Sequence, residues 1–97
     1  MKAVREVFEF DWDKGNTKKN QKHNVADKEA EEVFFDENKF IYKDKLHSKH
    51  EERFVVLGMT EKDRLLYVVF TKRGKKVRII SARNINKKEV ELYEKAT

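Results

Sequence analysis

Hydrophobic and polar residues follow one another in a regular order near the start of the chain. Aromatic and polar residues alternate over residues 7–12, which predicts a strand with its aromatic side chains on one face. Asp13 is then a suitable N-cap for a polar helix over residues 14–23. Asn24 tolerates the left-handed conformation that ends many helices, so we expect the polar helix to stop there.

A second helix, with one apolar side, is expected to follow. Asp27 is its expected N-cap, and the acidic residues after it suit the positive end of a helix dipole. The apolar stripe of this helix is expected to consist of Ala26, Ala30, Val33 and Phe34. Residues 39–42 then predict a short strand, and residues 43–52 predict a polar loop.

The second half of the chain has the pattern of a β-meander that ends in a helix. Strands are expected over residues 53–58, 64–71 and 77–83, and Gly74 supplies the positive φ angle that the last turn needs. Asn86 and Glu89 have the spacing of a capping box at the start of the final helix. The pattern therefore indicates one α+β domain over residues 1–97. We expect its antiparallel sheet to pack against two N-terminal helices and a C-terminal helix.

Composition excludes several classes of protein. The 97 residues contain no cysteine, which excludes disulfides and thiolate chemistry. The longest apolar runs, residues 54–57 and 65–70, are far shorter than the ~20 residues that span a bilayer, and the first residues lack the apolar stretch of a secretory signal. We therefore expect a cytoplasmic protein. The three glycines stand apart from one another and no Gly-x-Ser-x-Gly motif occurs, so no phosphate-binding loop, cofactor site or classical hydrolase site is expected.

The charged residues are segregated along the chain, and this points to an anionic partner. The net charge is +5, with five basic residues and no acid over residues 72–78 and four lysines and no acid over residues 14–22. Residues 27–37 reverse the sign, with six acids against Lys28. Such a distribution favours binding of a nucleic-acid backbone on one side of the protein. The alternative is a hairpin tip and a helix that are merely solvated.

Two further features have a chemical and a structural interpretation. Arg83 closes a predicted strand on the opposite face from Arg78, where its guanidinium could hold a phosphate bidentately or form a structural salt bridge with an acid of the second helix. His47 and His50 bring groups that exchange protons near neutrality, but a metal site would need a third ligand that the pattern does not supply. Glu52 is either part of this chemistry or a surface ion pair with its neighbour Arg53.

Ordered blocks over most of the chain resemble one family. The chain is similar to BrnT-family toxins at residues 10–16, 22–25, 29–34, 47–48, 51–54, 64–66, 68–71, 73–74 and 78–83. The blocks Glu51-Glu52-Arg53-Phe54 and Ile80-Ser81-Ala82-Arg83 are the most specific of these.

The resemblance implies a ribonuclease toxin of a bacterial type II toxin–antitoxin system with a RelE-like fold. Such a toxin cuts RNA and halts translation until a BrnA-like antitoxin with a ribbon-helix-helix part neutralises it, and operator DNA is bound only through the antitoxin. No membrane partner is implied.

Metal-independent RNA cleavage needs a base for the ribose 2′-hydroxyl, cations for the phosphorane and an acid for the leaving 5′-oxygen. We expect Arg53 and Arg83 to bind the phosphate, with Glu52 or His23 as base and His47 as acid. The residues expected to hold the RNA backbone are Lys22, Lys72, Arg73 and Arg78. The alternatives are a non-catalytic RNA- or protein-binding module of the same fold and a DNA-binding repressor, for which no helix-turn-helix pattern is present.

Overall fold

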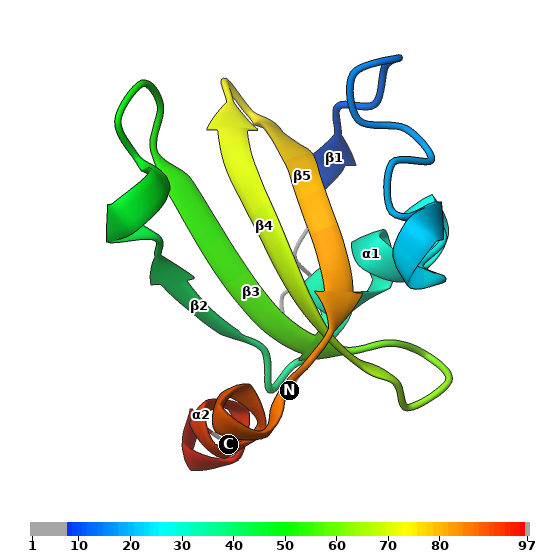
Figure 1. Ribbon diagram of the computed structural model, residues 1–97, viewed down its shortest axis with the longest axis vertical. Helices are drawn as coiled ribbons and strands as arrows, with labels where there is room; N and C mark the ends of the chain where they lie inside the picture. The colour runs from blue at the N-terminus through cyan, green and yellow to red at the C-terminus, as the bar shows by residue number, and fades with distance from the viewer. Residues whose placement is uncertain (1–7, 97) are drawn as a thin grey trace, which may run out of the picture.

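A five-stranded sheet organises the molecule (Figure 1). The structure is a computed structural model that describes residues 8–96. Its strands are β1 (Glu9–Phe10), β2 (Phe40–Lys43), β3 (Arg53–Met59), β4 (Leu65–Arg73) and β5 (Lys76–Asn84). Its helices are α1 (Asp27–Glu32) and α2 (Lys87–Ala96), with short 3-10 helices η1 (Gln21–His23), η2 (Val33–Phe35) and η3 (Lys45–His47). The α+β class is therefore confirmed.

The sheet is mixed, which corrects the prediction of a purely antiparallel sheet. The strand order is β1-β5-β4-β3-β2, and strands β2 to β5 form the expected antiparallel meander. Strand β1 instead pairs in parallel with β5, with Glu9 opposite Lys76 and Phe10 opposite Val77. The first strand is shorter than predicted because the chain leaves the sheet after Asp11, whose N–H still donates to the carbonyl of Val77 at 2.8 Å. Val7, the first residue of the predicted strand, lies outside the described residues.

The predicted helix over residues 14–23 is wrong. The segment forms turns followed by the single turn η1, and Lys18 has a left-handed φ of 56° that interrupts any helix. Its asparagines complete the sheet instead. Asn16 donates to the carbonyl of Ile79 at 3.0 Å, and Asn20 accepts from the N–H of Ala82 at 2.9 Å. Both side chains are buried. They bond to backbone groups of β5 at positions where β1 has ended and no strand of the described chain pairs with this edge of β5.

The end of η1 agrees with the prediction, whereas the start of the next helix differs from it. Asn24 ends η1 with φ 56° and ψ 35°, which confirms it as the left-handed terminator. The N-cap of the next helix is Ala26 rather than Asp27, because the carboxylate of Asp27 accepts the N–H of Lys18 and the hydroxyl of Thr17. The N–H of Ala26 donates to the Glu29 carboxylate at 3.0 Å, which stabilises the first turn of α1.

Helices α1 and η2 cover one face of the sheet. Ala30, Val33 and Phe34 are buried against it as predicted, whereas Ala26 is exposed. The packing is close at Gly58, where a Cβ would lie only 2.7 Å from the carbonyl oxygen of Val33. A side chain at this position would push η2 away from β3. This face contains the larger core cluster.

The other face is covered only at one end. Helix α2 contacts β2 and β3, and in Figure 1 it lies beyond their lower ends. Within residues 8–96, only the short η3 lies beside the upper end of β3, and the upper parts of β4 and β5 carry no helix on this side. Its start confirms the capping box, because Asn86 and Glu89 exchange backbone-to-side-chain hydrogen bonds of 2.9 Å in both directions. Tyr93 anchors the helix in a smaller cluster. No helix in the described residues has the length and apolar character needed to cross a membrane.

A bulge in β5 changes the face of the sheet on which Arg83 lies relative to Arg78. Val69 pairs with Ser81 and Phe70 pairs with Ile79, so Ile80 is an extra residue in the ladder. Arg78 lies opposite Thr71 and Arg83 lies opposite Tyr67, two positions of β4 that share a face. The two arginines therefore lie on the same face, the one with α2, and not on opposite faces as plain alternation predicts. Gly74, in the turn before β5, has φ +61°, as expected.

The asparagine contacts make a prediction about stability. Asn20→Ala removes the acceptor for the buried N–H of Ala82, so we expect it to destabilise the protein by roughly 1–3 kcal/mol in urea denaturation. Gln21→Ala changes an exposed side chain next to it and is expected to have little effect. Equal stability of the two variants would contradict the role of Asn20 in closing the edge of β5.

Candidate functional site

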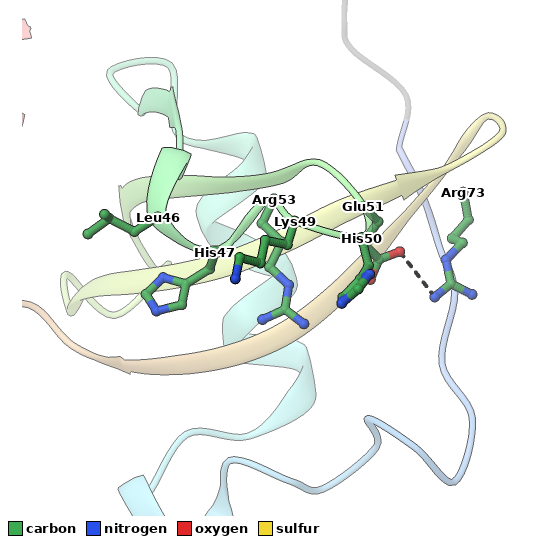
Figure 2. A pocket seen from close by; sticks show the side chains of 7 residues that line it. All are labelled: Leu46, His47, Lys49, His50, Glu51, Arg53 and Arg73. Carbon is green, nitrogen blue, oxygen red and sulfur yellow. Dashed lines mark hydrogen bonds and ion pairs between the residues drawn. The ribbon is translucent and has the colours of Figure 1, made fainter.

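An open pocket of about 500 Å³ lies at the end of the sheet away from α2. The residues that line it are Leu46, His47, Lys49, His50, Glu51, Arg53 and Arg73. Figure 2 shows that most of them come from the loop between β2 and β3, with Arg53 at the start of β3 and Arg73 at the end of β4. Histidines and cations therefore meet at one place, as the sequence suggested for His47, Arg53 and Arg73.

Hydrogen bonds at the base of this loop hold its two ends together. Asp44 donates its N–H to the carbonyl of Arg53 at 2.8 Å. Ser48 donates its hydroxyl to the carbonyl of Asp44 at 2.5 Å and accepts the N–H of Arg53 at 3.0 Å. Loop and strand are thus joined where the pocket begins, which fixes the positions of the side chains beside it.

His47 is held by one of its two ring nitrogens. Its Nδ1 lies 2.9 Å from the Oδ2 atom of Asp44, which is largely buried, while the ring itself is exposed. A carboxylate on Nδ1 orients the ring and leaves Nε2 to exchange a proton with a ligand. Asp44 was not identified from the sequence, although its spacing of three residues from His47 is the signal that could have shown it.

Arg53 has a free guanidinium. Its side chain is half-buried, and within residues 8–96 it makes no hydrogen bond or ion pair. The surface pair with Glu52, one of the two interpretations of that residue, does not form, because Glu52 bonds to Lys43 at 3.0 Å. Glu51 is the acid of the pocket, and it pairs with Arg73 at a long 3.4 Å (Figure 2). The site is therefore strongly cationic, with one arginine available for an anion.

Arg83 lies on the same face but has strong partners. Its guanidinium donates to the Glu89 carboxylate at 2.9 and 2.7 Å and to the carbonyl of Asn84 at 3.0 Å. It also lies 3.8 Å from the ring centroid of Tyr67. The structural salt bridge left open by the sequence is present, but its acid belongs to α2 and not to the second predicted helix.

Burial and charge shift the pKa values in this cluster. Desolvation raises the pKa of Tyr42 to about 12 and also raises the pKa of Tyr67. Burial opposes ionisation of Glu89, but the hydrogen bonds from Arg83 and Asn86 outweigh it, so the pKa of Glu89 is lowered. The hydrogen bond with Glu89 raises the pKa of Arg83. The pair is therefore fully charged at neutral pH.

Arg78 is also paired. Its guanidinium bonds to the carboxylate of Asp13 at 2.9 and 3.1 Å and lies 3.6 Å from the carboxylate of Asp11. The hydrogen bond from Arg78 lowers the pKa of Asp13. Arg78 thus holds the segment after β1 against β5, and two carboxylates screen the charge that was expected to bind RNA.

The structure does not bring the remaining expected site residues into the pocket. The carbonyl of His23 accepts from Arg64, which precedes β4, whereas Arg53 pairs with Thr71 near the other end of that strand. The separation is about 20 Å along the sheet. Lys22 belongs to the same short helix as His23. Lys72 lies over the ring of Phe54, on the face that α1 covers.

In the described part of the chain, no three His, Cys, Asp or Glu side chains gather in a way that could hold a metal ion. His47 and His50 line the pocket together; Asp44 bonds to His47, and Glu51 pairs with Arg73. The residues that line the pocket include more cations than acids, which suits an anionic ligand.

Comparison with known proteins is consistent with these observations. Residues 12–89 match the model of a family described as "Ribonuclease toxin, BrnT, of type II toxin-antitoxin system". The match includes the pocket, the β-meander and the start of α2. A search among curated proteins returned no match.

The pairing of Glu89 predicts a pH-dependent loss of stability. Because the folded-state pKa of Glu89 is lowered, its contribution is present above the usual glutamate pKa and is lost as the pH falls through the folded value. We expect Glu89→Gln to destabilise the protein by roughly 1–3 kcal/mol at pH 7 and by progressively less as the pH falls below the usual glutamate pKa, in urea denaturation. Glu91→Gln, at an exposed position of the same helix, is the control. A pH-independent difference would contradict the lowered pKa.

Proposed function

Since the chain belongs to the BrnT family of ribonuclease toxins of type II toxin–antitoxin systems, we propose that it is a metal-independent endoribonuclease whose reaction takes place in the pocket beside Arg53. The observation that carries this proposal is the Arg53 guanidinium, which has no hydrogen-bond or ion-pair partner among residues 8–96 and lies in a pocket that also contains two histidines. An arginine without a carboxylate partner in a cationic pocket is well suited to a phosphate group.

The reaction needs no water and no external nucleophile. The ribose 2′-oxygen attacks the adjacent phosphorus while its proton passes to a base, and the bond to the 5′-oxygen breaks as that oxygen receives a proton from an acid. The products are a 2′,3′-cyclic phosphate and a 5′-hydroxyl. Catalysis then requires two proton-transfer groups and a cation for the phosphorane charge.

The pocket residues provide these groups. Arg53 stabilises the phosphorane, and its fork of N–H donors matches two non-bridging phosphate oxygens. His47, oriented by Asp44, and His50 supply the acid and the base. Glu52 and His23, the bases expected from the sequence, are replaced in this scheme because they point to other partners or lie at the other end of the sheet.

The charge of the pocket supports two parts of the proposal, that the substrate is RNA and that the reaction is metal-independent. Lys49, Arg53 and Arg73 face a single acid, Glu51, which Arg73 neutralises. Such a site attracts the RNA backbone and repels a divalent cation. Cleavage of cellular RNA would inhibit translation.

The same charge determines the kind of antitoxin we expect. A BrnA-like antitoxin with a ribbon-helix-helix part would cover the pocket with an acidic segment and contact operator DNA itself. Charge complementarity favours this arrangement, because the toxin has a net charge of +5 and the pocket concentrates positive charge. Antitoxin and RNA would then compete for Arg53.

Substitutions in the pocket test the assignment. We expect Arg53→Ala to reduce the rate of RNA cleavage by about 100- to 1,000-fold, with Arg53→Lys in between, and His47→Ala by at least about 100-fold. Cleavage of a defined RNA by purified protein is the measurement. His23→Gln distinguishes the two ends of the sheet, since the pocket mechanism predicts an unchanged rate. A large loss with His23→Gln and none with Arg53→Ala would overturn the assignment.

The products and the metal requirement give an independent test. Cleavage should continue at the same rate with excess EDTA and should leave a 2′,3′-cyclic phosphate, detected by mass spectrometry of the fragments. Products with a 5′-phosphate, or loss of activity with EDTA that Mg²⁺ restores, would contradict the mechanism. RNA that is bound but never cut would instead support the non-catalytic binding module.

A further inference from the structure

The planar guanidinium of Arg83 lies over the ring of Tyr67 on the open face of the sheet. It lies 3.8 Å from the centroid of the Tyr67 ring, a stacking distance, and Tyr67 is its cross-strand partner on β4. The two bonds to Glu89 and the bond to the carbonyl of Asn84 fix its orientation. The Arg83 side chain is nevertheless 39% exposed, so part of it faces solvent.

The partners of Arg83 make it a poor phosphate ligand. Glu89 neutralises its charge, and that carboxylate is itself only 11% exposed and cannot move into water without losing the capping box of α2. A phosphate at Arg83 would have to displace Glu89 or lie beside it against like-charge repulsion. Arg53 has neither constraint.

A planar cation stacked on an aromatic ring is instead suited to a nucleobase. Proteins that bind single-stranded nucleic acid stack unpaired bases on aromatic rings and on guanidinium planes, and the charge of the backbone is bound elsewhere. Tyr42, in the same cluster of partly buried residues as Tyr67, adds apolar surface to this area. Helix α2 contacts β2 and β3 beside it and so borders the area on one side.

The position of the stack relative to the pocket fits a single RNA strand. Arg83 lies opposite Tyr67 and Arg53 lies opposite Thr71, four residues further along β4 and on the same face. The two arginines are therefore separated by about 13 Å along the strands and about 10 Å across them. In Figure 1 no helix of the described residues crosses β3 and β4 between α2 at one end and the β2–β3 loop at the other, so a short stretch of RNA can reach from one arginine to the other.

We propose that Arg83, stacked on Tyr67, is a platform for one unpaired base of the RNA, a few nucleotides from the phosphate bound at Arg53. This inference rests on the proposed function and changes the role expected for Arg83 from a phosphate ligand to a base-positioning residue. Tyr67 supports the platform from below.

The first experiment uses the unchanged protein. A short single-stranded RNA with a 2′-O-methyl group at the cleaved position is made in a series, each member with one abasic nucleotide, and its affinity is measured by fluorescence anisotropy. We expect one position to weaken binding by roughly 5- to 100-fold, while the others have small effects. If the abasic nucleotide weakens binding equally at every position, the proposal that Arg83 stacks with one base is wrong, but the proposed function remains intact. If even the intact RNA neither binds nor, unmodified, is cleaved, both fail.

The second experiment couples protein and RNA changes. Arg83→Lys keeps the charge but removes the plane, so the abasic RNA should bind the variant and the wild-type protein equally while the intact RNA binds the variant more weakly. Independent effects of the two changes, with intact and abasic RNA weakened equally by Arg83→Lys, would overturn the proposal.

Matched variants guard against effects of folding. Arg64→Lys also alters an arginine that is paired with a glutamate, Glu29, but without an aromatic ring beneath it, and should leave RNA affinity unchanged. Tyr67→Phe keeps the ring and should retain binding, whereas Tyr67→Leu should lose the abasic-sensitive part of the affinity. Thermal denaturation by circular dichroism confirms that each variant is folded at the assay temperature.

Discussion

One extra residue in β5 determines which residues share the open face of the sheet. The bulge at Ile80 moves Arg83 to the face of Thr71, Arg53 and Arg78, while Val77, Ile79 and Ala82 all remain in the core. Without it, one end of β5 would direct its charged side chains into the core beneath α1. The cationic face and the larger core therefore depend on the same local irregularity.

The arginines on this face differ in what holds them, and this separates structural from functional roles. Arg78 is engaged by two aspartates and Arg83 by Glu89, so both fix the segments that they touch. Arg53 makes no such bond among the described residues and lines a pocket with two histidines. Removing Arg83 leaves the buried Glu89 carboxylate without its ion-pair partner, whereas the charge of Arg53 is available to a ligand. Net charge alone does not distinguish these cases.

The elements that depend on neighbouring residues could be predicted from the sequence. The predictions were wrong where contacts between distant parts of the chain determine the structure. The meander, Asn24, Gly74 and the capping box are confirmed because each depends on a few neighbouring residues. The polar helix over residues 14–23 is wrong because its asparagines bond to β5, far away in the sequence. His47 and Arg53 were expected in one site and share a pocket. The partners of Arg78 and Arg83 could not be predicted, because they depend on the bulge and on how the segments that contain Asp13 and Glu89 pack against the sheet. The partner of Glu52 depends on the pairing of β2 with β3.

The most direct test of RNA binding on this face is the NMR spectrum of the arginine side chains. The Nε–H signals of the folded protein are recorded before and after addition of a non-cleavable single-stranded RNA. The account predicts that the signals of Arg53 and Arg83 move while that of Arg64, which is paired with Glu29 of α1 on the other side of the sheet, does not. Movement confined to Arg64, with Arg53 and Arg83 unchanged, would contradict it.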